Sequence, residues 1–108
     1  MRLSLLRRNA VFERDQRLSR RLQLGQIVAT PGALAALEDS GEQPGDFLAR
    51  HASGDWGDLC EEDRQENEYA LVHGFRVLSC YRLCNGAKLW AITEADRSVT
   101  TLLLPEEY

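Results

Sequence analysis

Apolar and polar residues alternate along the last third of the chain in a pattern typical of antiparallel strands. Three such runs cover residues 75–84, 87–93 and 99–104. Asn85-Gly86 separates the first two, and Asn-Gly is a strong hairpin signal because both residues tolerate positive φ. A two-residue turn of type I′ there predicts Tyr81 opposite Trp90, an aromatic cross-strand pair. The pattern therefore predicts a three-stranded antiparallel meander.

The region before the meander predicts one strand and three helices. The strand covers residues 26–29, and the helices begin at Pro31, at Pro44 (to Ala52) and at Leu59 (to His73). Thr30 is the expected N-cap of the first helix and Gly41 its end. In the last helix the apolar side chains of the final two turns, among them Tyr69 and Val72, are expected to be buried. The fold class is thus α+β, with helices on one face of a meander that the 26–29 strand can join.

Charge divides the 108 residues into two parts. Residues 1–22 hold seven arginines against two acids, a net of +5, which leaves −9 on residues 23–108 of a chain whose total is −4. We expect a basic, helical arm followed by a single domain over 23–108. The arm is either a solvated leader or a nucleic-acid contact, with Arg7, Arg8, Arg20 and Arg21 as candidate binding residues.

No apolar run approaches the roughly 20 residues of a membrane span, and the short run from Leu3 to Leu6 is no secretory signal. The sequence thus predicts a cytoplasmic protein without a membrane partner. Cys60, Cys80 and Cys84 are expected to be reduced thiols that pack as small hydrophobes. Their spacing lacks the Cys-x-x-Cys pairs of metal sites, so neither a metal nor a cofactor is expected.

Asp55-Trp56, between two glycines, is the most distinctive loop. Trp56 either anchors a ligand or fills a gap between helices while Asp55 and Asp58 cap the next helix; we prefer the second interpretation. The acids that follow, with Glu61 and Glu62 as candidate binding residues, either form a solvated face or bind a basic partner. They lack the regular spacing of a calcium loop. His51 and His73 lie near helix ends, where stabilising terminal carbonyls is a more common role than acting as a base.

Residues 24–108 resemble a family of small, uncharacterised bacterial proteins described as hypothetical or plasmid-related. The resemblance is carried by Leu24 to Leu34, Gly54 to Gly57, Trp90 to Ala95 and Thr100 to Tyr108. It implies an accessory protein of a plasmid or mobile element. Some members are called the methylation subunit of a type I restriction enzyme, but this chain lacks the glycine loop and the Pro-Pro-aromatic motif that such a subunit needs.

Three functions are compatible with these features. The preferred hypothesis is a non-enzymatic protein-interaction module of the anti-defence type, whose acidic body contacts a protein partner. The alternatives are a nucleic-acid-binding protein using the arginine arm, and a small ribonuclease-like toxin or hydrolase. The last would require a cleft that joins His51, Asp55 and Arg97.

Overall fold

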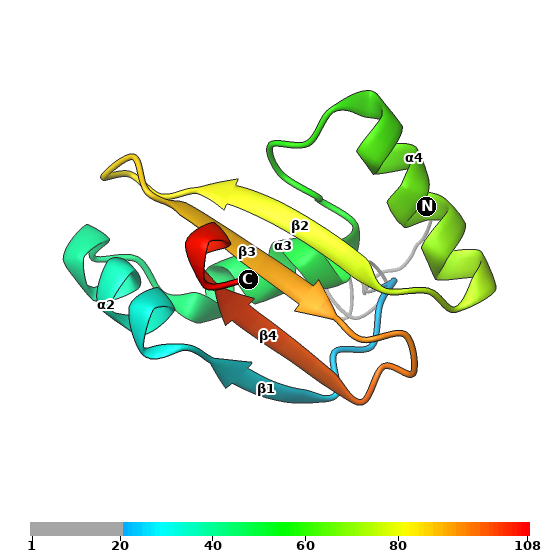
Figure 1. Ribbon diagram of the computed structural model, residues 1–108, viewed down its shortest axis with the longest axis horizontal. Helices are drawn as coiled ribbons and strands as arrows, with labels where there is room; N and C mark the ends of the chain where they lie inside the picture. Colours follow the sequence, from blue (N-terminus) through cyan, green and yellow to red (C-terminus); the bar gives the residue numbers. More distant parts are fainter. Residues whose placement is uncertain (1–20) are drawn as a thin grey trace, which may run out of the picture.

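The computed structural model describes residues 21–108, which fold as α+β, as the sequence predicted (Figure 1). The elements are β1 (Gln26–Ala29), α2 (Pro31–Ser40), α3 (Pro44–Ser53), α4 (Glu61–His73), β2 (Val77–Arg82), β3 (Lys88–Thr93), β4 (Val99–Leu103) and the 3-10 turn η1 (Pro105–Glu107). No helix among the described residues is long and apolar enough to cross a membrane. The expectations for the arginine arm, including Arg7, Arg8 and Arg20, fall outside this part of the chain.

The four strands form one mixed sheet in the order β1-β4-β3-β2. Strands β2, β3 and β4 make the predicted antiparallel meander, and β1 joins it as an edge strand parallel to β4. In Figure 1, α3 lies behind the sheet and η1 in front of it. Each helix contacts a different strand: α2 contacts β4, α3 contacts β3 and α4 contacts β2.

The predicted register of the hairpin is wrong by one residue. Tyr81 lies opposite Leu89, and Trp90 lies opposite Cys80. The turn has three residues, and only the last of them, Gly86, has positive φ, at 92°. A shift of one residue moves every side chain to the other face of a strand, and the observed register keeps Tyr81 and Leu89 together in the core. Core packing therefore determines the register, and a three-residue turn accommodates it.

The helix boundaries follow the predicted signals at α2 and at the end of α4, which is His73, but not at the start of α4. Thr30 accepts the amide proton of Ala33, and its helix closes at Gly41 in the left-handed conformation. Helix α4 begins two residues later than predicted, because the preceding segment runs along the outer edge of β2. There the Asp58 amide donates to the carbonyl of Cys80, whose own amide donates to the carbonyl of Trp56.

Two apolar clusters fill the space between helices and sheet. The first contains Ala33, Leu37, Phe47, Tyr81, Leu83, Leu89, Ala91 and Leu102; the second contains Leu22, Leu24, Ala52, Trp56, Ala70 and Val77. Leu22, placed by sequence in the basic arm, is only 2% exposed. The amides of Arg21 and Leu22 both donate to the carbonyl of Ala52. The folded domain therefore includes Arg21 and Leu22, two residues earlier than the predicted boundary.

Candidate functional site

A chain of polar side chains crosses the core between the two apolar clusters. His51 of α3 lies at its centre, with Nδ1 2.6 Å from the Ser79 hydroxyl and Nε2 2.9 Å from the Thr93 hydroxyl. Thr93 is 2.6 Å from the Thr100 hydroxyl, which donates to the carbonyl of Leu24 at 2.7 Å. The four side chains are fully buried. The chain thus ties α3, three strands and the segment before β1 together.

The proton positions in this network follow from its far end. The single hydroxyl proton of Thr100 goes to a backbone carbonyl, so Thr93 must donate to Thr100. Thr93 then has no proton left for His51 and must accept from Nε2–H. Burial lowers the pKa of His51 to about 4, so the ring is neutral at pH 7. Nδ1 is therefore an acceptor, and Ser79 donates to it.

Ser79 and His51 have the spacing of a nucleophile and its base, but both are fully buried, with no exposed surface at either side chain. No substrate reaches them in this conformation, so the network is structural. The expectation that His51 stabilises helix-terminal carbonyls is wrong, because its ring points into the core. Both ring nitrogens of His51 and the three hydroxyls have hydrogen-bond partners, and these bonds fix the orientation of α3 relative to the sheet.

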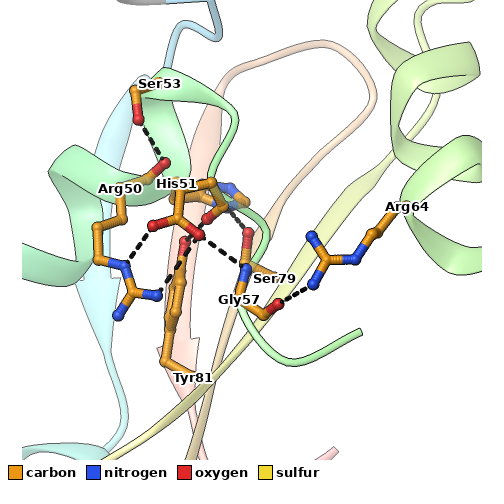
Figure 2. Close-up of polar contacts among 8 residues, drawn as sticks. Arg50, His51, Ser53, Gly57, Arg64, Ser79 and Tyr81 are labelled. Carbon is orange, nitrogen blue, oxygen red and sulfur yellow. Dashed lines mark hydrogen bonds and ion pairs between the residues drawn. The ribbon is translucent and has the colours of Figure 1, made fainter. Parts of the chain in front are cut away.

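The Asp55 loop is fixed by hydrogen bonds to its side chain and backbone, and Figure 2 labels the partners Arg50, Gly57 and Tyr81. The Asp55 carboxylate accepts from Arg50 Nε at 2.7 Å and from the Gly57 amide at 3.1 Å. Its backbone carbonyl accepts the Tyr81 hydroxyl at 2.7 Å, and the Arg50 guanidinium lies 4.5 Å from the centre of the Tyr81 ring. The hydrogen bonds from Arg50 and Gly57 hold the pKa of Asp55 below its usual range. Asp55 is thus a structural anion that organises the turn.

The rest of this loop connects α3 to the edge of β2. Gly57 has φ of 78°, and a Cβ there would lie 2.1 Å from the carbonyl oxygen of Cys80. Arg64 of α4 donates to the carbonyls of Gly57 and Leu59 (Figure 2 shows the first of these bonds). Trp56 is 2% exposed, so the preferred interpretation of it as a core residue is confirmed and a ligand anchor is excluded in this conformation.

One other sequence expectation about this region is wrong. Asp55 and Asp58 do not cap α4, whose N-cap is Cys60 without a side-chain hydrogen bond. Asp58 instead forms an ion pair with Arg82 of β2. Arg97 donates to the carbonyls of Ala70 and Phe75 near the end of α4. With His51 buried and Arg97 engaged there, these side chains and Asp55 do not form a common cleft.

The cysteines are placed differently from the prediction. Cys80 is buried, but Cys60 and Cys84 are exposed, and Cys84 lies in the hairpin turn rather than on a strand face. Among residues 21–108 no group of three or more His, Cys, Asp or Glu side chains is placed to hold a metal ion.

Arg21, the described member of the candidate nucleic-acid set, is paired within the fold. Its guanidinium contacts both carboxylate oxygens of Glu68 on α4, and Glu68 also accepts the indole N–H of Trp56. The hydrogen bond from Arg21 holds the pKa of Glu68 below its usual range. The described part of the arm therefore fastens the start of the domain to α4.

Helix α4 carries an exposed apolar group at its C-terminal end. Tyr69 is 55% exposed, Val72 77% and Phe75 54%, although Tyr69 and Val72 were expected to be buried. The rings of Tyr69 and Phe75 are stacked, with centroids 5.9 Å apart, and the ring of His73 lies 4.1 Å from Tyr69. Only Asn67 and Ala70 of the helix are buried.

The N-terminal half of the same helix is acidic. Glu61, Glu62, Asp63 and Glu66 are exposed, and none of them forms an ion pair with another residue of the described chain. Glu62, Glu66 and Tyr69 lie at helical spacing on one face. Carboxylates and aromatic rings thus share one continuous surface, which we call the α4 surface: Glu61, Glu62, Asp63, Glu66, Tyr69, Val72 and Phe75. It includes the candidate residues Glu61 and Glu62.

Sequence reasoning found the acidic half of this surface and missed the aromatic half. Phe75 was assigned to the start of a strand, whereas β2 begins at Val77. The available signal was the weak apolar periodicity of residues 61–73, which gives the helix little to bury.

Comparison of the chain with protein-family models, with curated proteins and with solved structures finds no significant match.

Proposed function

We propose that this protein is a non-enzymatic interaction module that binds a basic segment of a partner protein on the α4 surface. The observation that carries the proposal is the exposure of Tyr69, Val72 and Phe75 beside acids that have no basic partner within residues 21–108. Clustered apolar exposure on a small domain commonly marks a contact site.

Burial on one helix supports this interpretation. A surface helix normally buries an apolar stripe against its own domain, yet α4 buries only Asn67 and Ala70. Ala70 and the half-buried Leu71 pack against the second apolar cluster, and Arg64 and Arg97 add hydrogen bonds to backbone carbonyls. Tyr69 and Val72 take no part in that contact. The apolar side chains are therefore available to another molecule.

Charge indicates the chemistry of the partner. The acidic half attracts arginine or lysine, and the aromatic half suits an aliphatic or aromatic side chain, with Tyr69 able to contact either. Seven residues separate Glu62 from Tyr69, which is about 10 Å along a helix. The expected ligand is a segment whose basic group lies about 10 Å from an apolar anchor, which is two turns of a helix or three residues of a strand.

The proposal is tested with a fluorescein-labelled helical peptide that carries two arginines on one turn, and leucine and phenylalanine two turns later. Fluorescence anisotropy with the full chain should detect binding that weakens as salt rises, since exposed charges are screened. The double change E62K/E66K should weaken it at least about fourfold, because it replaces roughly 0.2–1 kcal/mol of attraction per pair by a similar repulsion. Y69A should weaken it independently of salt.

The matched control is E38K/D39K, which makes the same charge change at exposed positions of α2. It should leave binding of the ordered peptide nearly unchanged. A scrambled peptide should bind more weakly than the ordered one to the wild type and to this control. Equal binding of ordered and scrambled peptides, or equal loss in both double variants, would show that only net charge matters and would refute the site.

The resemblance to plasmid-related proteins suggests where a natural ligand is to be sought. Basic surfaces occur on proteins that handle nucleic acid, including host defence complexes, and an acidic surface can compete for them. An anti-defence accessory role is the form of the proposal that agrees with that resemblance.

A further inference from the structure

The two outer edges of the sheet differ in how their backbone groups are satisfied. At β2, the side chain of Asn67 bonds both the amide and the carbonyl of Leu78. The next outward residue, Cys80, bonds the backbone of Trp56 and Asp58. This edge is therefore closed by dedicated contacts.

Among residues 21–108, the edge at β1 is open. Gln26 donates its amide to the carbonyl of Ser98, which places Gln26 and Val28 toward β4 in the parallel ladder. Ile27 and Ala29 alternate with them, so their amides and carbonyls point outward. Within residues 21–108 no group bonds to these outward atoms, and Figure 1 shows no described element along this edge.

Strand β1 also lacks the features that keep free edges apart. Natural edge strands carry lysine, proline or a bulge, whereas the sequence of β1 is Gln-Ile-Val-Ala. Ile27 is 43% and Val28 39% exposed, on opposite faces of the strand. An uncharged, apolar, unpaired edge is a template for another strand.

We propose that β1 pairs antiparallel with β1 of a second copy, about a two-fold axis that passes beside Val28. In this register Ile27 lies opposite Ala29 of the other copy, and the two residues exchange both backbone hydrogen bonds. The same exchange occurs on the other side of the axis. All four outward groups of each strand are satisfied, and the two Val28 side chains meet in a non-hydrogen-bonded pair.

A second copy fits because the edge is complementary to itself. An isologous contact needs a surface that matches its own rotated image, and two outward residues spaced evenly about Val28 provide it. The pairing joins two four-stranded sheets at β1 and leaves β2 and α4 at the far ends. The α4 surface stays accessible in the dimer, so this inference does not depend on the proposed function.

The test uses sedimentation equilibrium of the full chain over a range of concentrations. The wild type should dimerise reversibly. V28K and V28E should each be monomeric, because like charges then face each other across the axis, and an equimolar mixture should dimerise again. L34K, a change at an exposed position of α2, is the control and should dimerise like the wild type. Dimerisation that V28K leaves intact would place the contact on another surface and overturn the proposal.

Amide hydrogen exchange on the wild type provides a second test, which does not depend on whether a variant folds correctly. The amides of Ile27 and Ala29 should exchange rapidly at low concentration and become protected as the dimer forms, while those of Gln26 and Val28 stay protected throughout. Rapid exchange of Ile27 and Ala29 at every concentration would overturn the pairing. Protection in a monomer would also overturn it, since another part of the same chain would then cover the edge.

Discussion

Protonation of His51 should destabilise the fold in a pH range where no carboxylate with a lowered pKa titrates. The folded pKa of about 4 lies below the value near 6.5 of the unfolded chain. Between these values the unfolded state binds more protons, so stability falls as pH falls from about 6.5 and levels off below the folded pKa. At about 1.4 kcal/mol per pKa unit, the full loss is ~3 kcal/mol. The cause is burial, because the charged ring would lie in the core away from water. Protonation of Nδ1 would also require the Ser79 hydroxyl to turn from donor to acceptor.

The assay is urea unfolding at several pH values from 7.5 to 5. The wild type should lose more than about 1 kcal/mol over this range. H51Q should be less stable at pH 7.5 but nearly independent of pH above 5. H73Q, a change at the exposed histidine, is the control and should keep the wild-type slope. The carboxylates with lowered pKa values, such as Asp55 and Glu68, act below this range. An equal slope in H51Q and the wild type would refute the lowered pKa of His51.

Changes at three sites, Leu22, Gly57 and Asn67, test other contacts by chemical denaturation. L22A should cost about 2–5 kcal/mol because it empties a core position, and a chain that begins at residue 21 should stay folded whereas one that begins at residue 24 should not. G57A should destabilise by more than about 1 kcal/mol, since its Cβ has no room and φ is positive, whereas G45A, in open space within α3, should stabilise by roughly 0.5–1 kcal/mol. N67A should cost about 1–3 kcal/mol because both backbone groups of Leu78 lose their partner; N67D, which keeps only the acceptor, should not restore the loss.

Local signals in the sequence predicted most of the fold. The Thr30-Pro31 cap, the glycine ends of the helices and the alternating runs each act over a few residues, so they can be recognised without the rest of the chain. The hairpin register could not be predicted in the same way. It depends on which side of β2 and β3 faces α3, which is a property of the assembled core.

The candidate site was predicted less well, for a related reason. Asp55 and Trp56 stood out as unusual residues, yet their contacts with Arg50 and Glu68 make them structural. The polar chain through His51 joins segments that lie far apart in sequence, and no local pattern indicates it. Exposure of Tyr69 was missed because an aromatic residue near a helix end is more often buried, and only the packed structure shows that this helix is held by other contacts.

The central claim is that the α4 surface binds a basic segment, and a chemical-shift map tests it most directly. The ¹⁵N-labelled full chain is titrated with the arginine- and leucine-containing peptide, and amide shifts are followed at each residue. The account predicts that the largest changes lie on α4, from Glu61 through Phe75, and that they disappear in E62K/E66K. Changes confined to the Asp55 loop or to the sheet, with those residues unaffected, would contradict it.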